Sequence, residues 1–94
     1  MHTETIQLRP EVLVFAQLME KRLQQKDMDK GTRWKSKDPY DLICDTGLAA
    51  HRLRCAVTAN DISSTIRLAV DLANFSMMVA DVSGALGVDS EVSA

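Results

Sequence analysis

Aromatic residues are scarce in this chain of 94 residues. Only Phe15, Trp34, Tyr40 and Phe75 are aromatic, although 46% of the residues are hydrophobic. The core must therefore be filled by aliphatic side chains, alanine and methionine. Because strands favour aromatic and β-branched residues, this shortage favours helices. A chain of this length has room for one core and buries a modest share of its surface, so a second subunit would help to complete that core.

Cysteine is also sparse, with Cys44 and Cys55 as the two thiols. On a single helix they would lie about 16 Å apart, whereas a disulfide spans Cα atoms separated by at most about 7 Å. Two unpaired thiols are typical of a reducing cytoplasm. Because no cluster of cysteine and histidine is present, the sequence predicts no zinc site.

Long hydrophobic runs and a leader sequence are missing as well. The most apolar stretch, residues 68–86, is interrupted by Asp71, Asn74 and Asp81, which makes it too polar to span a membrane. The first residues lack the basic start and the apolar run of a signal peptide. We therefore expect a soluble, cytoplasmic protein without a membrane partner.

Charge is almost balanced at −2, but it is unevenly distributed, since residues 21–37 hold seven lysines or arginines against two aspartates. The net charge argues against a general nucleic-acid binder. The basic segment is either a solvated hairpin or an anion site, in which Lys30, Arg33 and Lys35 would hold phosphates. Three roles stay open for Trp34: an anchor in a protein interface, a ring that stacks on a base, or a plug at the end of a helical bundle.

Apolar residues recur at helical spacing in three segments, which predicts an all-α fold, a small bundle of three main helices in one domain. The first and third helices are expected at residues 10–26 and 61–83. The second begins at Asp38-Pro39, a strong start signal, and ends at a polar break over residues 58–61. The core is expected over residues 10–84, with a loop at 27–37 and flexible ends at 1–9 and 85–94.

Single residues refine this prediction. Asn60 or Asp61 is suited to cap the third helix, and Gly84 and Gly87 to end it. Gly47 lies inside the second helix, where glycine costs roughly 1 kcal/mol relative to alanine. We expect its benefit to be the close approach of a neighbouring helix.

The third helix is the most apolar. Its two apolar stripes together cover roughly two-thirds of the circumference, more than a surface helix needs. The first stripe consists of Ile62, Ile66, Ala69, Ala73, Met77 and Ala80, and the second of Leu68, Leu72, Phe75, Val79 and Val82. Two shorter helices can hardly cover such a surface, so we expect a homodimer whose subunits share one bundle. The remaining arc carries Arg67, Asp71, Asn74 and Met78.

Recognised catalytic motifs are missing. The chain has no glycine-rich phosphate loop, no paired-cysteine motif and only two histidines, so it predicts no hydrolytic triad. The carboxylates that could hold Mg²⁺ are Asp41 and Asp45 on the second helix and Asp71 on the third. The simpler role for Asp71 is an ion pair with Arg67, one turn earlier.

Three segments carry a resemblance to a known family. Residues 14–21 read Val-Phe-Ala-Gln-Leu-Met-Glu-Lys, residues 30–34 read Lys-Gly-Thr-Arg-Trp, and residues 71–84 read Asp-Leu-Ala-Asn-Phe-Ser-Met-Met-Val-Ala-Asp-Val-Ser-Gly. They resemble, in turn, the opening helix, the His-Lys-Gly-Gly-Trp loop and the third-helix run Asp-Val-Ala-Asn-Phe-Ala-Met-Met-Ile-Ala-Asp-x-x-Gly of MazG-like nucleotide pyrophosphohydrolases, all-α enzymes that act on nucleoside triphosphates. The resemblance spans residues 12–84 and implies a bundle formed by dimerisation.

The metal ligands of that family are largely missing here. The family carries Glu-Glu-x-x-Glu on its second helix and Glu-x-x-Asp on its third. In this chain Leu68 takes the place of the third-helix glutamate, which leaves Asp71 as a vestigial ligand, and Arg52 and Arg54 add positive charge to the second helix. One or two acids cannot offset the cost of dehydrating Mg²⁺. We therefore expect no catalytic residues and no cofactor.

Two functions follow from this resemblance. The first is a non-catalytic protein that binds a macromolecule, such as a phage-borne inhibitor or regulator of a bacterial host system, in the host cytoplasm. Its partner- or anion-binding candidates are Lys30, Arg33, Trp34, Lys35 and Asn74, and nucleotide or nucleic acid would bind through the loop at 30–37. The alternative is a residual Mg²⁺-dependent pyrophosphohydrolase, or a nucleotide binder without turnover, with Asp71 and either Asp45 or Asp41 at the ion.

Overall fold

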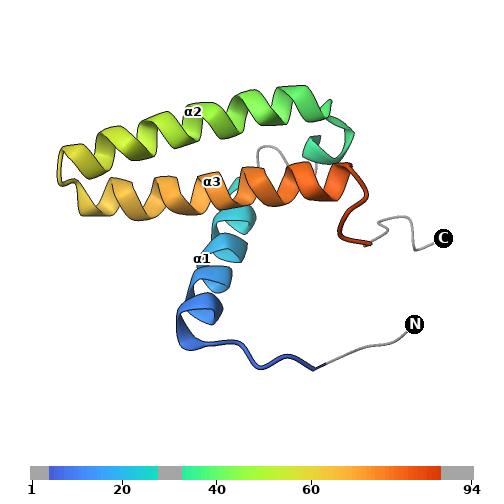
Figure 1. Cartoon of the computed structure of the whole chain (residues 1–94), viewed down its shortest axis with the longest axis horizontal. Coiled ribbons are helices and arrows are strands. Elements are labelled where there is room, and N and C mark those ends of the chain that lie inside the picture. Colours follow the sequence, from blue (N-terminus) through green and yellow to red (C-terminus); the bar gives the residue numbers. More distant parts are fainter. Residues whose placement is uncertain (1–4, 28–32, 88–94) are drawn as a thin grey trace.

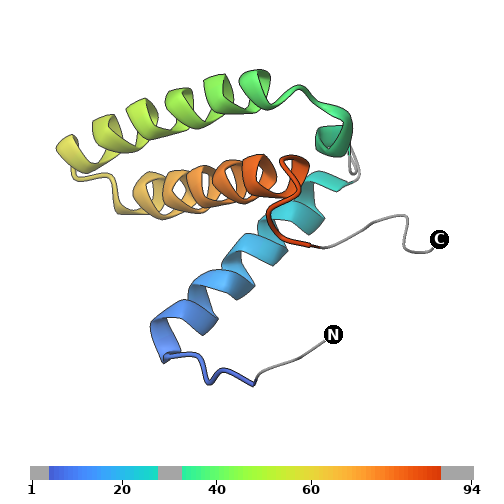
Figure 2. The same cartoon turned by 45° about the vertical axis from the view of Figure 1, so that its right-hand side comes forward.

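The computed structural model describes residues 5–27 and 33–87, and within these ranges it is all-helical with no β-strand, which confirms the predicted fold class. Its elements are α1 (Pro10–Asp27), the short 3₁₀ helix η1 (Arg33–Ser36), α2 (Pro39–Thr58) and α3 (Ile62–Val82). The helices α2 and α3 form an antiparallel hairpin, and α1 crosses α3 and runs away from the hairpin at a steep angle (Figures 1 and 2).

The two helices of the hairpin begin at the predicted caps. The side chain of Asp38 accepts a hydrogen bond from the backbone N–H of Tyr40 at 2.8 Å, and Pro39 occupies the first turn of α2. The side chain of Asp61 accepts a hydrogen bond from the N–H of Ser64 at 3.1 Å and caps α3. Each carboxylate satisfies a donor that the first helical turn leaves unpaired.

The core lies between the two helices of the hairpin and under α1. The helical period of the sequence predicts one apolar stripe on α2, formed by Leu42, Ala49, Leu53 and Ala56, and three of these residues are buried: Leu42, Ala49 and Ala56. The buried residues of α3 are Leu68, Val70, Asp71, Asn74 and Met78. No residue of α1 is buried, so α1 rests on the hairpin with one half-buried face.

The position of α1 corrects the prediction for the third helix. The arc of α3 outside its two apolar stripes, the polar arc, carries Asp71, Asn74 and Met78, and these three residues are buried because α1 packs on that side of α3. The expected pair of Asp71 with Arg67 is wrong as well, since Asp71 pairs with Arg22 of α1.

Two further expectations differ from the structure. Gly47 is exposed, and among the described residues no atom beyond the neighbouring residues of its own helix lies within 4 Å of the Cβ that a substitution would add, so none of the described helices packs closely against it. The expected loop at 27–37 contains η1, and its residues 28–32 lie outside the described residues, as do 1–4 and 88–94 of the expected flexible ends. Cys44 and Cys55 are both free thiols, as predicted, and the structure shows both to be exposed. Among the described residues, none of the helices is long and apolar enough to cross a membrane.

Candidate functional site

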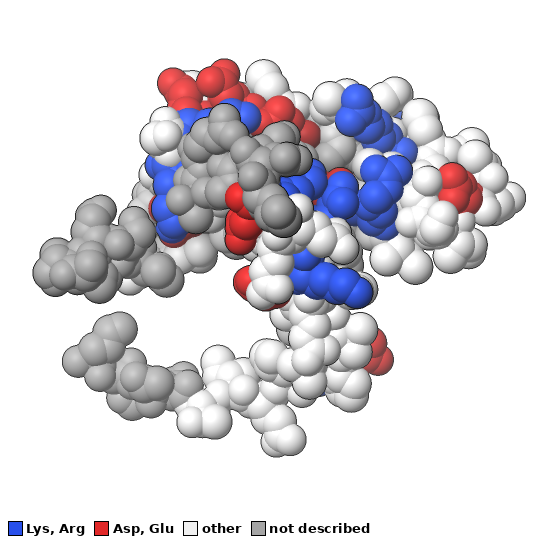
Figure 3. Space-filling view, turned by 180° about the vertical axis from the view of Figure 1, so that it is seen from behind, with Lys and Arg blue, Asp and Glu red and all other residues white. Residues whose placement is uncertain are grey.

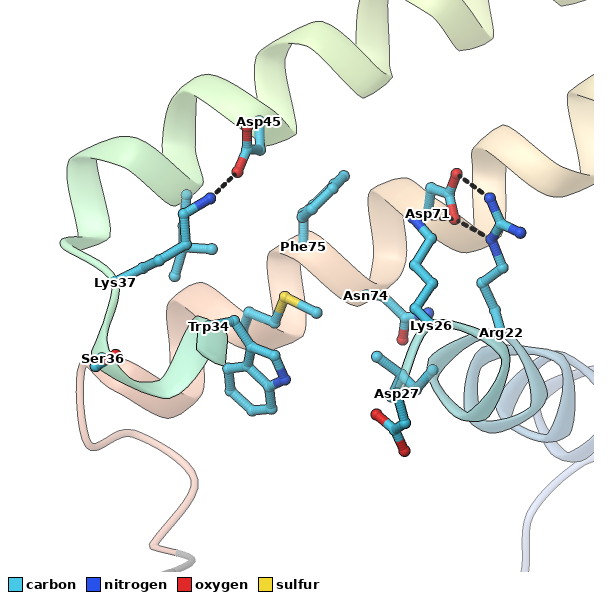
Figure 4. Close-up of a pocket in the computed structure, with 13 residues that line it drawn as sticks. Arg22, Lys26, Asp27, Trp34, Ser36, Lys37, Asp45, Asp71, Asn74 and Phe75 are labelled. Carbon is cyan, nitrogen blue, oxygen red and sulfur yellow. Dashed lines mark hydrogen bonds and ion pairs between the residues drawn. The ribbon is translucent and has the colours of Figure 1, made fainter. Parts of the chain in front are cut away.

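A cavity of about 650 Å³ opens where the end of α1, η1, the start of α2 and the middle of α3 meet (Figure 4). Its lining combines rings, aliphatic side chains and charges of both signs. The apolar part consists of Leu23, Trp34, Leu42, Phe75 and Met78. The polar part consists of Arg22, Lys26, Asp27, Ser36, Lys37, Asp45, Asp71 and Asn74. A cavity of this size and mixed chemistry is typical of a small-ligand site.

Trp34 is held at one wall of the cavity by the residue that follows it. The ammonium group of Lys35 lies 4.6 Å from the centroid of the Trp34 ring, within the range of a cation–π interaction. The same ammonium group donates a hydrogen bond to Asp81 of α3 at 2.9 Å. This ion pair ties η1 to the end of α3, and Trp34 itself is half-buried.

Two carboxylates of the cavity are each paired with a cation of the same chain (Figure 4). Nε of Arg22 donates to Oδ1 of Asp71 at 2.9 Å, and Nζ of Lys26 lies 4.0 Å from the same oxygen. Nζ of Lys37 donates to Oδ2 of Asp45 at 2.8 Å. The charges of Asp71 and Asp45 are therefore compensated by cations of the same chain, in a mostly buried pair and an exposed pair respectively.

This donor set does not fit a magnesium site. Within residues 5–27 and 33–87, no group of three or more histidine, cysteine, aspartate or glutamate residues could hold a metal ion. Mg²⁺ requires six oxygen ligands in near-octahedral geometry and keeps its water tightly. Asp71 would have to release Arg22 to bind the ion, and the cavity offers too few oxygens in return.

Asn74 has one polar atom without a partner. Its Nδ2 donates to the carbonyl oxygen of Met19 at 3.2 Å, which fixes the amide between α3 and α1. Its Oδ1 is buried and accepts no hydrogen bond. A buried acceptor without a donor costs about 1–3 kcal/mol. Because Asn74 lines the cavity, a ligand with an N–H or O–H group would relieve this cost.

The structure brings together four of the predicted site residues, Trp34, Asp45, Asp71 and Asn74, on the wall of one cavity, whereas Asp41 is exposed and does not line it. Lys35 lies beside them, but its ammonium group is bound to Asp81. Lys30 lies outside the described residues, as does the side chain of Arg33.

Sequence reasoning missed the cations of the cavity that come from α1. Arg22 and Lys26 are four residues apart and therefore lie on one face of a helix. That face is the one that α1 presents to α3, since Leu23 and Met19 on it are half-buried as well. The four-residue spacing of Arg22 and Lys26 can be read from the sequence, but it does not show which carboxylate the two side chains contact.

Comparisons with protein-family models, with curated proteins and with solved structures give no match for this chain. The resemblance to MazG-like enzymes therefore stays a prediction from the residues quoted above.

Proposed function

We propose that this chain is a degenerate MazG-like protein that acts by binding another macromolecule and not by catalysis. The observation that carries the proposal is the pairing of Asp71 with Arg22 in the cavity, together with that of Asp45 with Lys37. In this proposal, cations of the protein neutralise the carboxylates that a metal-dependent hydrolase would use. The protein keeps a helical scaffold, and its exposed surface provides the contacts.

The proposed protein is a homodimer that regulates or inhibits a bacterial host protein or protein complex in the cytoplasm, as a phage-borne protein would. Support for binding comes from the large aliphatic side chains that α1 leaves exposed, among them Val12, Leu13 and Val14. Contiguous exposed apolar surface on a small domain marks an interaction site. Burying a half-exposed aliphatic side chain contributes about 1 kcal/mol, so a few of them stabilise an interface.

Catalysis is tested by measuring pyrophosphate release with Mg²⁺ and each of the eight common nucleoside triphosphates. We expect no turnover above the rate without protein, both for the unmodified chain and for Asp71→Ala. Turnover that is lost in Asp71→Ala would overturn the proposal, because it would show Asp71 to be a functional metal ligand. Turnover that is unchanged in Asp71→Ala would indicate a contaminating hydrolase.

Macromolecular binding is tested by retention from a bacterial lysate on the immobilised protein. A retained host protein supports the proposal only when the two purified proteins bind each other with saturable affinity. Retention that is equal on an unfolded sample of the same chain would count as adhesion to apolar surface. Failure to retain any protein from a range of bacterial lysates would contradict the proposal.

A second candidate function is nucleotide binding without turnover, which the cavity favours. Trp34 and Phe75 offer rings at its wall, Oδ1 of Asn74 offers an acceptor, and Lys26 lies at its rim. Trp34 is the only tryptophan, so its fluorescence reports on the cavity directly. We expect nucleotide to change this signal, and salt to weaken the change. Lys26→Gln should weaken binding, whereas the control Lys21→Gln, outside the cavity, should leave it unchanged.

A further inference from the structure

The first half of α1 is apolar on all sides. Between Val12 and Met19 the sequence reads Val-Leu-Val-Phe-Ala-Gln-Leu-Met, so Gln17 is its one polar residue. Eight residues make more than two turns of a helix, and their side chains therefore point in every direction around it. A helix that is apolar on all sides is a buried helix.

The structure leaves this segment exposed. Val14 is 55% exposed, and Val12, Leu13 and Leu18 are exposed as well. The hydrogen bonds that join α1 to α3 begin at the end of this segment, where the carbonyl oxygen of Met19 accepts from Asn74, and continue at Arg22, which donates to Asp71. The first half extends beyond the hairpin (Figures 1 and 2), and seen from behind it is almost free of charged side chains (Figure 3). Two more exposed aliphatic residues, Ile6 and Leu8, precede it.

A complementary surface lies on α3. At 100° per residue, the first apolar stripe of α3 lies about 130° around the helix from Asp71 and Asn74, which α1 covers. Ile62 and Ile66 on this stripe are 72% and 50% exposed. Ala69, Ala73 and Met77 continue it and are half-buried. The stripe carries no charged residue, and it forms a face of α3 that α1 leaves open.

We propose that the apolar segment in the first half of α1, residues 12–18, packs on this open face of α3 in a second copy of the chain. The arrangement is reciprocal about a two-fold axis, so each copy contributes one helix and one face. It deepens the proposed homodimer by naming its surfaces. A second copy of the chain is the partner that covers the open face of α3, because the chain itself presents both uncharged surfaces, the first half of α1 and this face. Closed two-fold dimers are also the commonest assemblies of identical chains.

The size of the two surfaces agrees with a stable dimer. Each copy contributes eleven apolar residues, namely Ile6, Leu8, Val12, Leu13, Val14, Leu18, Ile62, Ile66, Ala69, Ala73 and Met77. A standard interface has about 20–30 residues on each side, with an apolar centre and a polar rim. The eleven residues are enough for that centre, and the neighbouring polar residues provide the rim.

Sedimentation of the full chain with matched variants tests this proposal. We expect the unmodified protein to sediment at micromolar concentration with about twice the chain mass of 10.4 kDa. Leu13→Asp and Ile66→Asp should each weaken the dimer at least about tenfold, because each buries a charge in an apolar interface. Leu48→Asp and Val57→Asp place the same charge at exposed positions of α2 and should leave the dimer unchanged. Circular dichroism checks that all four variants keep their helices.

Mixed cross-linking gives a second measurement that does not depend on weakening the dimer. In a chain with Cys44→Ser and Cys55→Ser, one sample carries Leu13→Cys and another carries Ile66→Cys. After mixing and mild oxidation, we expect a disulfide that joins the two different variants. If the dimer persists in both aspartate variants, or if no mixed disulfide forms, the proposed surfaces are wrong. The proposed non-catalytic function is not affected by either result. A chain that sediments as a monomer would overturn the dimer itself, and turnover would overturn the function alone.

Discussion

Arg22 of α1 and Asp71 of α3 are joined by two contacts, from Nε to Oδ1 at 2.9 Å and from Nη2 to Oδ2 at 3.4 Å. The side chains are 27% and 11% exposed, so most of this ion pair is removed from water. The bidentate geometry suits the planar guanidinium group. Since no residue of α1 is buried, this pair and the bond from Asn74 to Met19 fix the crossing of α1 over α3.

The first prediction concerns the strength of this pair. Arg22→Ala leaves the carboxylate of Asp71 poorly solvated and without its closest cation. Because the arginine is partly exposed, we expect a loss of about 2 kcal/mol in the free energy of unfolding, below the full cost for a buried pair. Urea unfolding followed by circular dichroism measures this loss.

Lys37→Ala is the matched control for Arg22→Ala. The side chains of Lys37 and Asp45 are 44% and 35% exposed, so their ion pair is largely solvated. Exposed pairs contribute about 0.2–1 kcal/mol, and we expect a loss in that range. Equal losses in the two variants would contradict the view that the Arg22 pair holds α1 in place.

The sequence predicted the features of this fold that depend on nearby residues. Asp38 and Asp61 cap the helices that follow them, because a cap acts over two or three residues. The helical period also predicted which face of α2 is buried. The polar arc of α3 was misjudged because its burial depends on α1, and Asp71 meets Arg22 across 49 positions in the sequence. Periodicity on one helix does not show which polar residues find a partner on another helix.

A second prediction concerns Lys35 and Asp81, which tie η1 to α3. The side chain of Asp81 is largely buried, and Asp81→Asn removes the charge that holds the ammonium group beside Trp34. We expect η1 to loosen, so that Trp34 emission shifts to longer wavelength and is quenched more strongly by acrylamide. The control Asp45→Asn removes the ion pair of Lys37 with α2 but leaves that of Lys35 with Asp81 intact, so it should change the quenching far less. Unchanged quenching in Asp81→Asn would show that Trp34 is held by apolar contacts alone.

A third prediction concerns the amide of Asn74. Asn74→Ala removes the hydrogen bond to the carbonyl oxygen of Met19, but it also removes the unpaired Oδ1, so we expect a net loss of only about 0.5–1.5 kcal/mol in the free energy of unfolding. Ser76→Ala is a suitable control, because Ser76 is exposed and bonds within its own helix to Leu72. Urea unfolding of both variants makes the comparison. A loss in Asn74→Ala no larger than that in Ser76→Ala would mean that the bond to α1 contributes little.

The last prediction is a dependence of stability on pH that arises at the start of α3. Hydrogen bonds from Ser64, from its side chain and then its backbone, lower the pKa of Asp61 below the ordinary value of 3.8. A carboxyl group with a lowered pKa in the folded state stabilises the protein above its unfolded pKa. That contribution is lost as the pH falls from the unfolded value through the folded value.

Asp61→Asn isolates this contribution, because asparagine also caps helices but does not titrate. We expect the unmodified chain to have a higher free energy of unfolding than Asp61→Asn at neutral pH, and this difference to disappear as the pH falls below 3.8. Urea unfolding of both proteins at a series of pH values gives the difference, and the other carboxyl groups titrate in both proteins and cancel from it. If the difference stays constant across this range, the charge of Asp61 does not stabilise α3, and the cap acts through its hydrogen bonds alone.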